Sequence, residues 1–149
     1  MAREIRHSFL IDAPPDAALR AVVREEDIRR WWTHEARIEA GRAVLGWSGH
    51  GWTVELDMEH DAAARRATWR CIRSNMQDTD AWEGTTITFV LTPEAGGTRL
   101  DFAQTGYRDS PCYETCEQGW AFFVGTSLRR YLETGCGLPY PEMQGTRPA

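Results

Sequence analysis

The residues of this sequence that could do chemistry are its cysteines, its histidines and one glycine-rich segment. Cys112 and Cys116 stand four positions apart near the start of an expected helix, where two thiolates could bind a metal ion or lie against each other. Cys71, Cys136 and the four histidines are scattered, so no second pair has the spacing of metal ligands. We therefore expect no metal and no cofactor, and we interpret Cys112 and Cys116 as small buried hydrophobic residues.

His60 and the segment Gly46–Gly51 come closest to catalytic patterns. His60 continues the alternation of Val54, Leu56 and Met58 at the end of an expected strand. It would serve as a general base if it faced a cavity near a carboxylate, but an exposed histidine at a strand end is the preferred interpretation. Gly46–Gly51 resembles a nucleophile elbow, yet its closing glycine stands one residue too late and no helix follows, so we expect a turn.

Length, composition and charge set the class of protein that must position these residues. The 149 residues are 42% apolar, which predicts one compact domain over 1–149 that ends in an extended tail from 138 to 149. The net charge is −5 and the arginines are dispersed, which argues against a nucleic-acid partner. The longest apolar runs have about five residues and the N-terminus is charged, so we expect a cytoplasmic protein without membrane insertion.

Two kinds of periodicity divide the chain. Apolar residues recur at helical spacing over Asp16–Trp32, with a break expected near Glu26, and again from Tyr113 to Tyr131, with Gly135 as the C-cap. A period of two predicts strands at Ile5–Ala13, Glu35–Ala40, Ala43–Trp47, Thr53–Glu59, Arg66–Arg73, Thr85–Thr92 and Thr98–Thr105. Short connections make neighbouring strands antiparallel. The expected fold class is therefore α+β, with a curved antiparallel sheet of about six or seven strands wrapped around a long C-terminal helix.

Several motifs of the sequence resemble those of one superfamily. They are Trp82–Leu91, Gly97–Phe102, Gly119-Trp120 and Tyr131–Gly135, together with Trp31-Trp32 and Pro139-Tyr140. On these residues the whole chain resembles the START-like superfamily, also called SRPBCC, which has the helix-grip fold. It is most similar to bacterial single-domain members of the branch named for activators of the heat-shock protein 90 ATPase. The resemblance implies the fold and leaves the activity open, because the superfamily holds lipid and hormone binders, aromatase/cyclases and co-chaperones.

In a helix-grip fold the cavity lies between the concave sheet and the long helix, and strand parity predicts which side chains face it. The expected ligand-binding residues are Trp47, Trp69, Cys71, Phe89, Leu91, Phe102, Trp120, Val124 and Tyr131. They would form an apolar pocket for a hydrophobic small molecule or lipid. The alternative is that these rings interlock and fill the interior as core.

The preferred hypothesis is ligand binding without catalytic machinery. A second hypothesis is an enzyme like the polyketide aromatase/cyclases or a hydrolase, which would need a polar side chain inside the apolar cavity. The candidates for that role are His60, Tyr107, Tyr131 and Cys71.

A third hypothesis is an interaction module, either a homodimer or a chaperone partner. Adjacent helical residues diverge by about 100°, so we expect one ring of Trp31 and Trp32 in the core and the other exposed near the cavity entrance or a dimer contact. This hypothesis predicts an exposed apolar patch around Trp32, Pro139 and Tyr140. The sequence has no counterpart of the additional N-terminal domain of eukaryotic members, so a chaperone partner is not expected.

Overall fold

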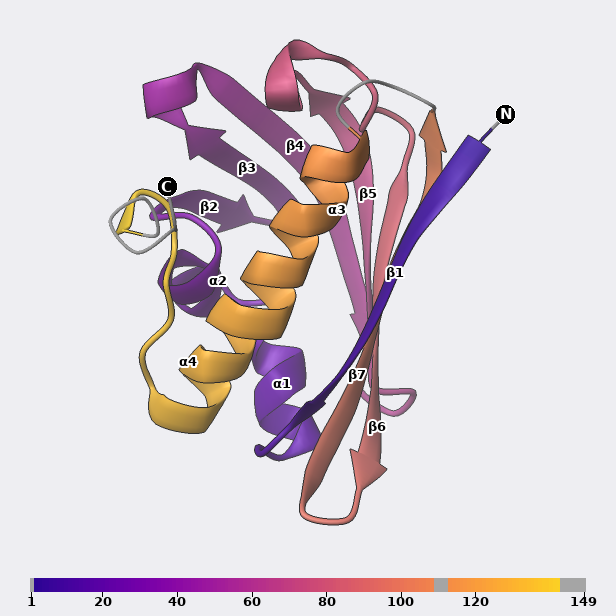
Figure 1. Ribbon diagram of the computed structural model, residues 1–149, viewed down its shortest axis with the longest axis vertical. Helices are drawn as coiled ribbons and strands as arrows, with labels where there is room; N and C mark the ends of the chain where they lie inside the picture. The colour runs from indigo at the N-terminus through magenta and orange to yellow at the C-terminus, as the bar shows by residue number, and fades with distance from the viewer. Residues whose placement is uncertain (1, 109–112, 143–149) are drawn as a thin grey trace.

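A seven-stranded antiparallel sheet curves around one long helix (Figure 1), in a computed structural model that describes residues 2–108 and 113–142. The strands are β1 (Ala2–Ile11), β2 (Glu35–Glu39), β3 (Arg42–Trp47), β4 (Trp52–Asp61), β5 (Arg66–Ser74), β6 (Thr86–Glu94) and β7 (Gly97–Arg108). Their order in the sheet is β1-β7-β6-β5-β4-β3-β2, with every neighbouring pair antiparallel. The predicted α+β helix-grip fold is confirmed.

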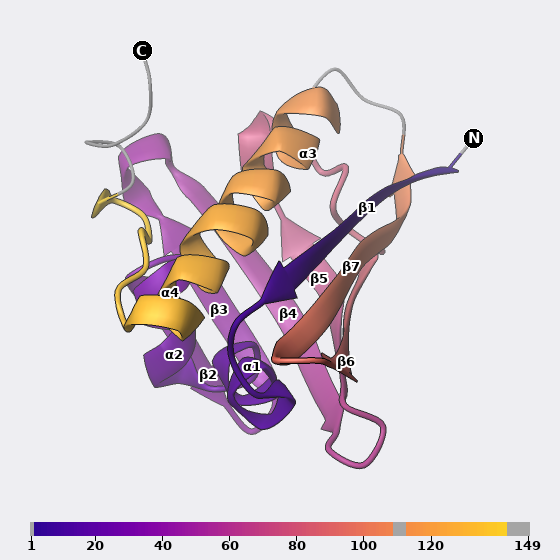
Figure 2. The same cartoon turned by 60° about the horizontal axis from the view of Figure 1, so that its bottom comes forward.

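The long helix lies across the concave face of the sheet, as Figures 1 and 2 show from two directions. It consists of α3 (Tyr113–Phe122), a π-helical segment η3 (Phe123–Leu128) and α4 (Arg129–Thr134), which follow one another without interruption. Gly135 ends it in the left-handed conformation, at φ 86°, and this confirms the predicted C-cap. The π-helical segment was not predicted.

Strand alternation explains why the interior is aromatic. On β5, Trp69 and Cys71 are buried while Arg70 and Ile72 are exposed. Because successive side chains of a strand point to opposite faces, the buried parity is the one that faces the long helix. The predicted parity of this strand is confirmed.

The first helical region is two helices, α1 (Pro15–Ala21) and α2 (Glu25–Trp31), so the break comes slightly before the predicted position near Glu26. A helix leaves its last carbonyl groups without partners inside the helix. Here two indole N–H groups reach the chain at this break. Trp31 donates to the Ala21 carbonyl at 2.7 Å, and Trp69 donates to the Val22 carbonyl at 3.0 Å. The break therefore anchors two of the core tryptophans.

The expectation that only one of Trp31 and Trp32 is buried is wrong. Both are buried, with exposures of 0% and 2%, and their rings stack with centroids 5.9 Å apart. Trp32 still donates its backbone N–H to the Ile28 carbonyl at the end of α2, and both rings are covered because Trp69 stacks on Trp31 at 6.4 Å and on Trp32 at 5.2 Å.

The chain after the long helix covers Trp32. Tyr140 donates its backbone N–H to the Trp32 carbonyl at 2.9 Å and accepts from the His34 N–H at 3.0 Å. Ser127 on the long helix also donates to the Trp31 carbonyl, at 2.7 Å. Pro139 and Tyr140 are buried as a result. The predicted exposed patch around Trp32, Pro139 and Tyr140 is therefore not present.

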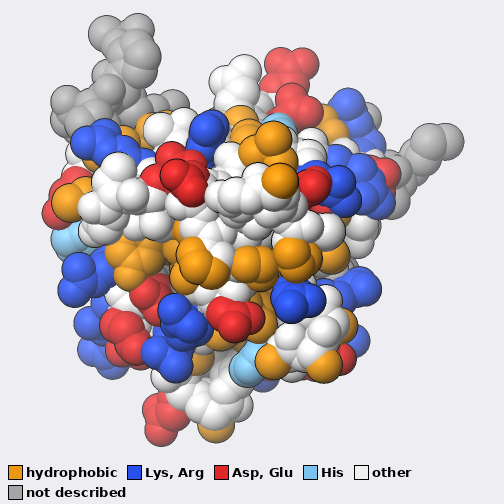
Figure 3. Space-filling model, turned by 90° about the horizontal axis from the view of Figure 1, so that it is seen from below, with side chains coloured by type: hydrophobic (Ala, Val, Ile, Leu, Met, Phe, Trp, Pro, Cys, Tyr) orange, Lys and Arg blue, Asp and Glu red, His pale blue; other side chains and the backbone are white. Residues whose placement is uncertain are grey.

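Charged side chains of both signs lie next to each other on the outer surface, as the face in Figure 3 shows. Arg42 contacts Asp57 at 2.7 Å, and Arg99 contacts Glu94 and Asp101 at 3.1 and 3.2 Å. Exposed pairs of this kind contribute little stability individually, and they keep the arginines from forming one basic stripe.

Within residues 2–108 and 113–142, no helix is long and apolar enough to cross a membrane.

A candidate ligand pocket at one end of the aromatic core

The interior is a continuous stack of aromatic rings with Trp32 at its centre. The Trp32 ring centroid lies 5.2 Å from that of Trp69 and 5.1 Å from that of Trp120. Trp47 meets it edge-on at 5.3 Å, and Trp82 extends the stack beyond Trp120 at 5.5 Å. Rings at these distances and angles attract one another beyond the effect of area burial, so the stack is a rigid frame for whatever lies at its ends.

One end of the stack is filled, and we call it the closed end (Trp31, Trp69, Phe89 and Leu91). It lies toward α1 and α2. The four side chains are at most 1% exposed, and Phe89 packs on Trp69 with ring centroids 4.7 Å apart. This end is hydrophobic core.

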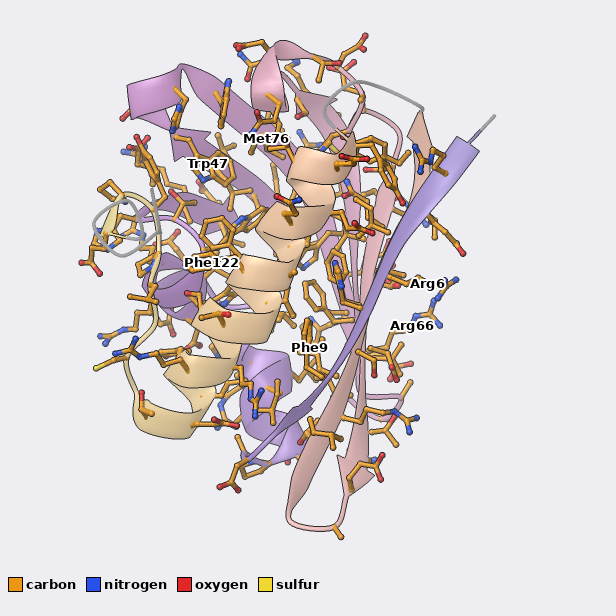
Figure 4. The ribbon with its side chains drawn as sticks, viewed as in Figure 1. Arg6, Phe9, Trp47, Arg66, Met76 and Phe122 are labelled. Carbon is orange, nitrogen blue, oxygen red and sulfur yellow. The ribbon has the colours of Figure 1, made fainter. Side chains whose placement is uncertain are left out.

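The other end, which we call the open end, contains a pocket of about 330 Å³. It lies between the turn η1 (Ser48–His50), the turn η2 (Met76–Asp78), the start of the long helix and Tyr140. Figure 4 shows Trp47 and Met76 on this side of the helix. The tryptophans that line it are Trp32, Trp47, Trp52, Trp82 and Trp120. The wall is therefore mainly aromatic.

A few polar groups interrupt the apolar wall. His50 stacks flat on Trp52 with ring centroids 4.3 Å apart, and Gln77 and Thr115 also line the pocket. Gln77 and the neighbouring Asp78 both have positive φ, at 58° and 62°. Residues other than glycine adopt this backbone conformation at a cost in free energy, and such residues often occur at binding sites.

Of the nine residues proposed for ligand binding, the structure places Trp47 and Trp120 on the pocket wall. Six others are buried and do not line it: Trp69, Phe89 and Leu91, which belong to the closed end, and Cys71, Phe102 and Val124. Tyr131 lies further along the long helix, where its hydroxyl donates to an Asp27 carboxylate oxygen at 2.5 Å. Burial and this hydrogen bond raise the pKa of Tyr131 to about 12.

None of the four side chains proposed as catalysts lines the pocket. His60 is exposed at the end of β4, and Tyr107 is buried against Tyr113 with ring centroids 5.3 Å apart. Burial, with the charge of Glu83, raises the pKa of the Cys71 thiol to about 12, so it holds its proton at neutral pH.

The glycine-rich segment is a turn, as predicted, and its Gly51 has φ 74°. Cys112, half of the possible cysteine pair, lies outside the described residues. Cys116 is 5% exposed and accepts a hydrogen bond from the Trp82 indole at 3.4 Å. Among the residues that the structure describes, no group of three His, Cys, Asp or Glu side chains could hold a metal ion.

The pocket residues in and beside the turns were not predicted from the sequence. His50, Met76 and Gln77 lie in the turns η1 and η2, and Trp52 is the first residue of β4, so the alternation that identified inward-facing residues does not reach them. The available signal was compositional, because an irregular link of residues 74–84 holds Met76 and Trp82, which are too apolar for a purely exposed loop.

The sheet, the long helix and the pocket between them define a helix-grip protein of the SRPBCC class. The chain belongs to the family described as activator of Hsp90 ATPase homolog 1-like protein, whose model matches residues 12–133. No curated protein matches the chain.

Solved structures share this fold at low sequence identity. The Aha1 dimer from Colwellia psychrerythraea has a TM-score of 0.77 and 21% identity, and the match covers 91% of this chain and 99% of that one. SSP2350 from Staphylococcus saprophyticus has a TM-score of 0.67 and 18% identity over 91% of this chain and 95% of that one. DynU16, from the dynemicin biosynthetic locus, has a TM-score of 0.66 and 24% identity over 90% of this chain and 48% of its own. At these identities the likeness supports the fold and no activity.

Proposed function

We propose that this protein binds a hydrophobic small molecule in the open-end pocket. The observation that carries the proposal is that five tryptophans converge on a space of about 330 Å³ instead of closing it. Binding sites for small molecules are usually concave and apolar, with a few polar groups that fix the orientation of the ligand. The size suits a compact molecule of two or three fused rings better than a diacyl lipid.

Rigidity supports the same proposal. The Trp120 indole donates to the buried Gln104 amide at 2.9 Å, and Gln104 donates to the Thr85 hydroxyl at 3.1 Å. These two hydrogen bonds fix the orientation of Trp120, which lines the pocket. A preformed site loses less side-chain freedom when a ligand binds, which favours affinity.

A pocket-filling variant tests the proposal. Gly119 lines the pocket on the long helix, and a Cβ atom added there would have no atom within 4 Å. Gly119→Leu should therefore occupy the space without disturbing the fold. We expect a naphthalene-ring probe to bind the wild-type protein in calorimetric titration and to bind Gly119→Leu at least about tenfold more weakly, because the side chain takes the place of the ligand.

Gln118→Leu is the matched control, because it places the same side chain on the adjacent, exposed position of the helix. It should bind the probe like the wild-type protein. Equal affinities of the wild-type protein and Gly119→Leu, or no binding by the wild-type protein, would show that the pocket is not a ligand site.

Self-association is a second proposal, favoured by one observation outside the pocket: the similar Aha1 structure from Colwellia psychrerythraea is a dimer. Among the described residues, the strongly exposed large apolar side chains are Leu10, Val44 and Ile72, which lie on β1, β3 and β5. These strands are not neighbours in the sheet, so they do not build one contiguous patch. Sedimentation equilibrium across a range of concentrations tests this proposal, and a monomer at the highest concentration would reject it.

A further inference from the structure

The hydrogen bonds of the seven tryptophans divide them into two groups. Five indole N–H groups donate to acceptors of the protein, at distances between 2.7 and 3.4 Å: those of Trp31, Trp52, Trp69, Trp82 and Trp120. The indole N–H groups of Trp32 and Trp47 have no partner among the described residues. Both side chains are nevertheless buried, with exposures of 2% and 4%.

These two N–H groups are not sealed inside the protein. In the described part of the chain, no fully buried side-chain nitrogen or oxygen lacks a hydrogen-bond partner. The two groups must therefore reach accessible space, and the space that both side chains line is the open-end pocket. Leaving a donor unpaired in an apolar site is costly, and an acceptor on a ligand would remove that cost.

The charge around the pocket limits what that acceptor can be. No Asp, Glu or Arg is among the described residues that line it. The segments that frame it are acidic, since residues 75–85 hold Asp78, Asp80 and Glu83, and α3 holds Glu114 and Glu117, with no arginine in either. His50 is the only basic side chain among the described residues that line the pocket, and no arginine is there to neutralise a carboxylate or phosphate ligand; burying an ion without a fixed counter-charge is expensive. A neutral oxygen, such as a carbonyl or an ether, carries no such penalty.

We propose that the ligand is a neutral aromatic compound whose carbonyl or ether oxygen accepts hydrogen bonds from the Trp32 and Trp47 indoles. The inference rests on the proposed function and names its ligand class. The other tryptophans of the pocket supply ring faces for stacking, because their N–H groups are already paired within the protein. Stacking provides affinity, and the two free donors select the position of one oxygen.

Three probes of almost equal shape separate the effect of the accepting oxygen from the effect of a negative charge. The first is methyl naphthyl ketone. The second is isopropenylnaphthalene, in which a methylene group replaces the ketone oxygen, and the third is naphthoate, which carries a negative charge. We expect calorimetry to show the ketone binding about three- to tenfold more tightly than the alkene, as for one net hydrogen bond. Naphthoate should bind at least about tenfold more weakly than the ketone.

Trp47→Phe keeps an aromatic ring and removes the N–H donor. It should reduce the ketone-to-alkene affinity ratio by about threefold or more, and the alkene affinity measured on the same variant accounts for the lost ring area. Trp52→Phe is the matched control, because Trp52 also lines the pocket but its N–H donates to Asp78 at 3.1 Å. The affinity ratio in Trp52→Phe should equal that of the wild-type protein.

The indole signals of the unmodified protein give a second readout that does not depend on the stability of any variant. In ¹⁵N-edited NMR spectra, the ketone should move the Trp32 and Trp47 N–H protons downfield relative to the alkene. If the alkene binds as well as the ketone, or naphthoate binds best, this inference is overturned and the proposed function stands. If none of the three probes binds, the proposed function itself fails.

Discussion

The closed end and the open end of the aromatic interior use the same residue types in different ways. At the closed end, the indole N–H groups of Trp31 and Trp69 donate to carbonyl groups at the break between α1 and α2. At the open end, those of Trp32 and Trp47 have no acceptor among the described residues. The closed end is covered by α1 and α2, and the open end by the start of the long helix together with two short turns. Aromatic content alone therefore does not distinguish a core from a binding site. The segments that cover each end and the hydrogen bonds of its indole N–H groups do distinguish them.

The same substitution at the two ends should have very different costs. Phe89→Ala removes a fully buried ring that packs on Trp69 and Phe102, so we expect the free energy of unfolding to fall by about 3–5 kcal/mol. Phe123→Ala removes a half-buried ring at the pocket, and we expect a loss of about 1–2 kcal/mol. Urea denaturation measures both. Equal losses would mean that the two ends are packed alike.

Two helical glycines sharpen the contrast between free and occupied space. A Cβ atom at Gly125 would lie 2.5 Å from Cε1 of Phe9, so Gly125→Ala should destabilise the protein by about 1 kcal/mol or more. Gly119→Ala meets nothing and improves helix propensity, so it should stabilise the protein by up to about 1 kcal/mol. Thermal or urea unfolding of both variants shows the signs. A destabilised Gly119→Ala would mean that the pocket is narrower than described.

The Tyr131 hydroxyl links the long helix to Asp27 of α2 by a hydrogen bond. Its titration should have a smaller effect on the free energy of unfolding than the substitutions above. Its pKa is raised from 10.0 to about 12 in the folded protein. The folded state therefore keeps a proton that the unfolded state loses, so this contribution to stability is present below pH 10 and is lost between pH 10 and 12. Tyr131 is partly exposed, and we expect less than about 1 kcal/mol after solvent screening.

Tyr131→Phe should flatten the decline of stability between pH 10 and 12 relative to the wild-type protein. Deprotonation of Cys71 also lowers the free energy of unfolding in this alkaline range, since the pKa of its thiol is raised from 9.0 to about 12. It is present in both proteins, so the difference between their curves isolates Tyr131. Parallel curves in denaturant titrations at several pH values would show that the Tyr131 hydrogen bond contributes nothing.

The sequence predicted the sheet well because its signal is repeated along every strand. Alternation places Trp69, Phe89 and Phe102 on one face, and the structure has them there. It could not predict the position of the pocket, because Trp52, Met76 and Gln77 lie in or next to turns and the direction of their side chains depends on long-range contacts. The burial of Trp32 likewise depends on Tyr140, which is distant in the sequence. Local periodicity identifies a core, whereas a site at the end of that core is set by chain segments that meet only after folding.

The seven tryptophans are built-in reporters for the central claim that one end of the interior binds ligand and the other does not. The direct measurement is a ¹⁵N-edited NMR titration with isopropenylnaphthalene, with the indole signals assigned from single Trp→Phe variants. We expect ring-current shifts to move the signals of Trp32, Trp47, Trp52, Trp82 and Trp120. The signals of Trp31 and Trp69 should stay nearly unchanged. Larger shifts at Trp31 and Trp69, or no shift at saturating probe, would contradict it.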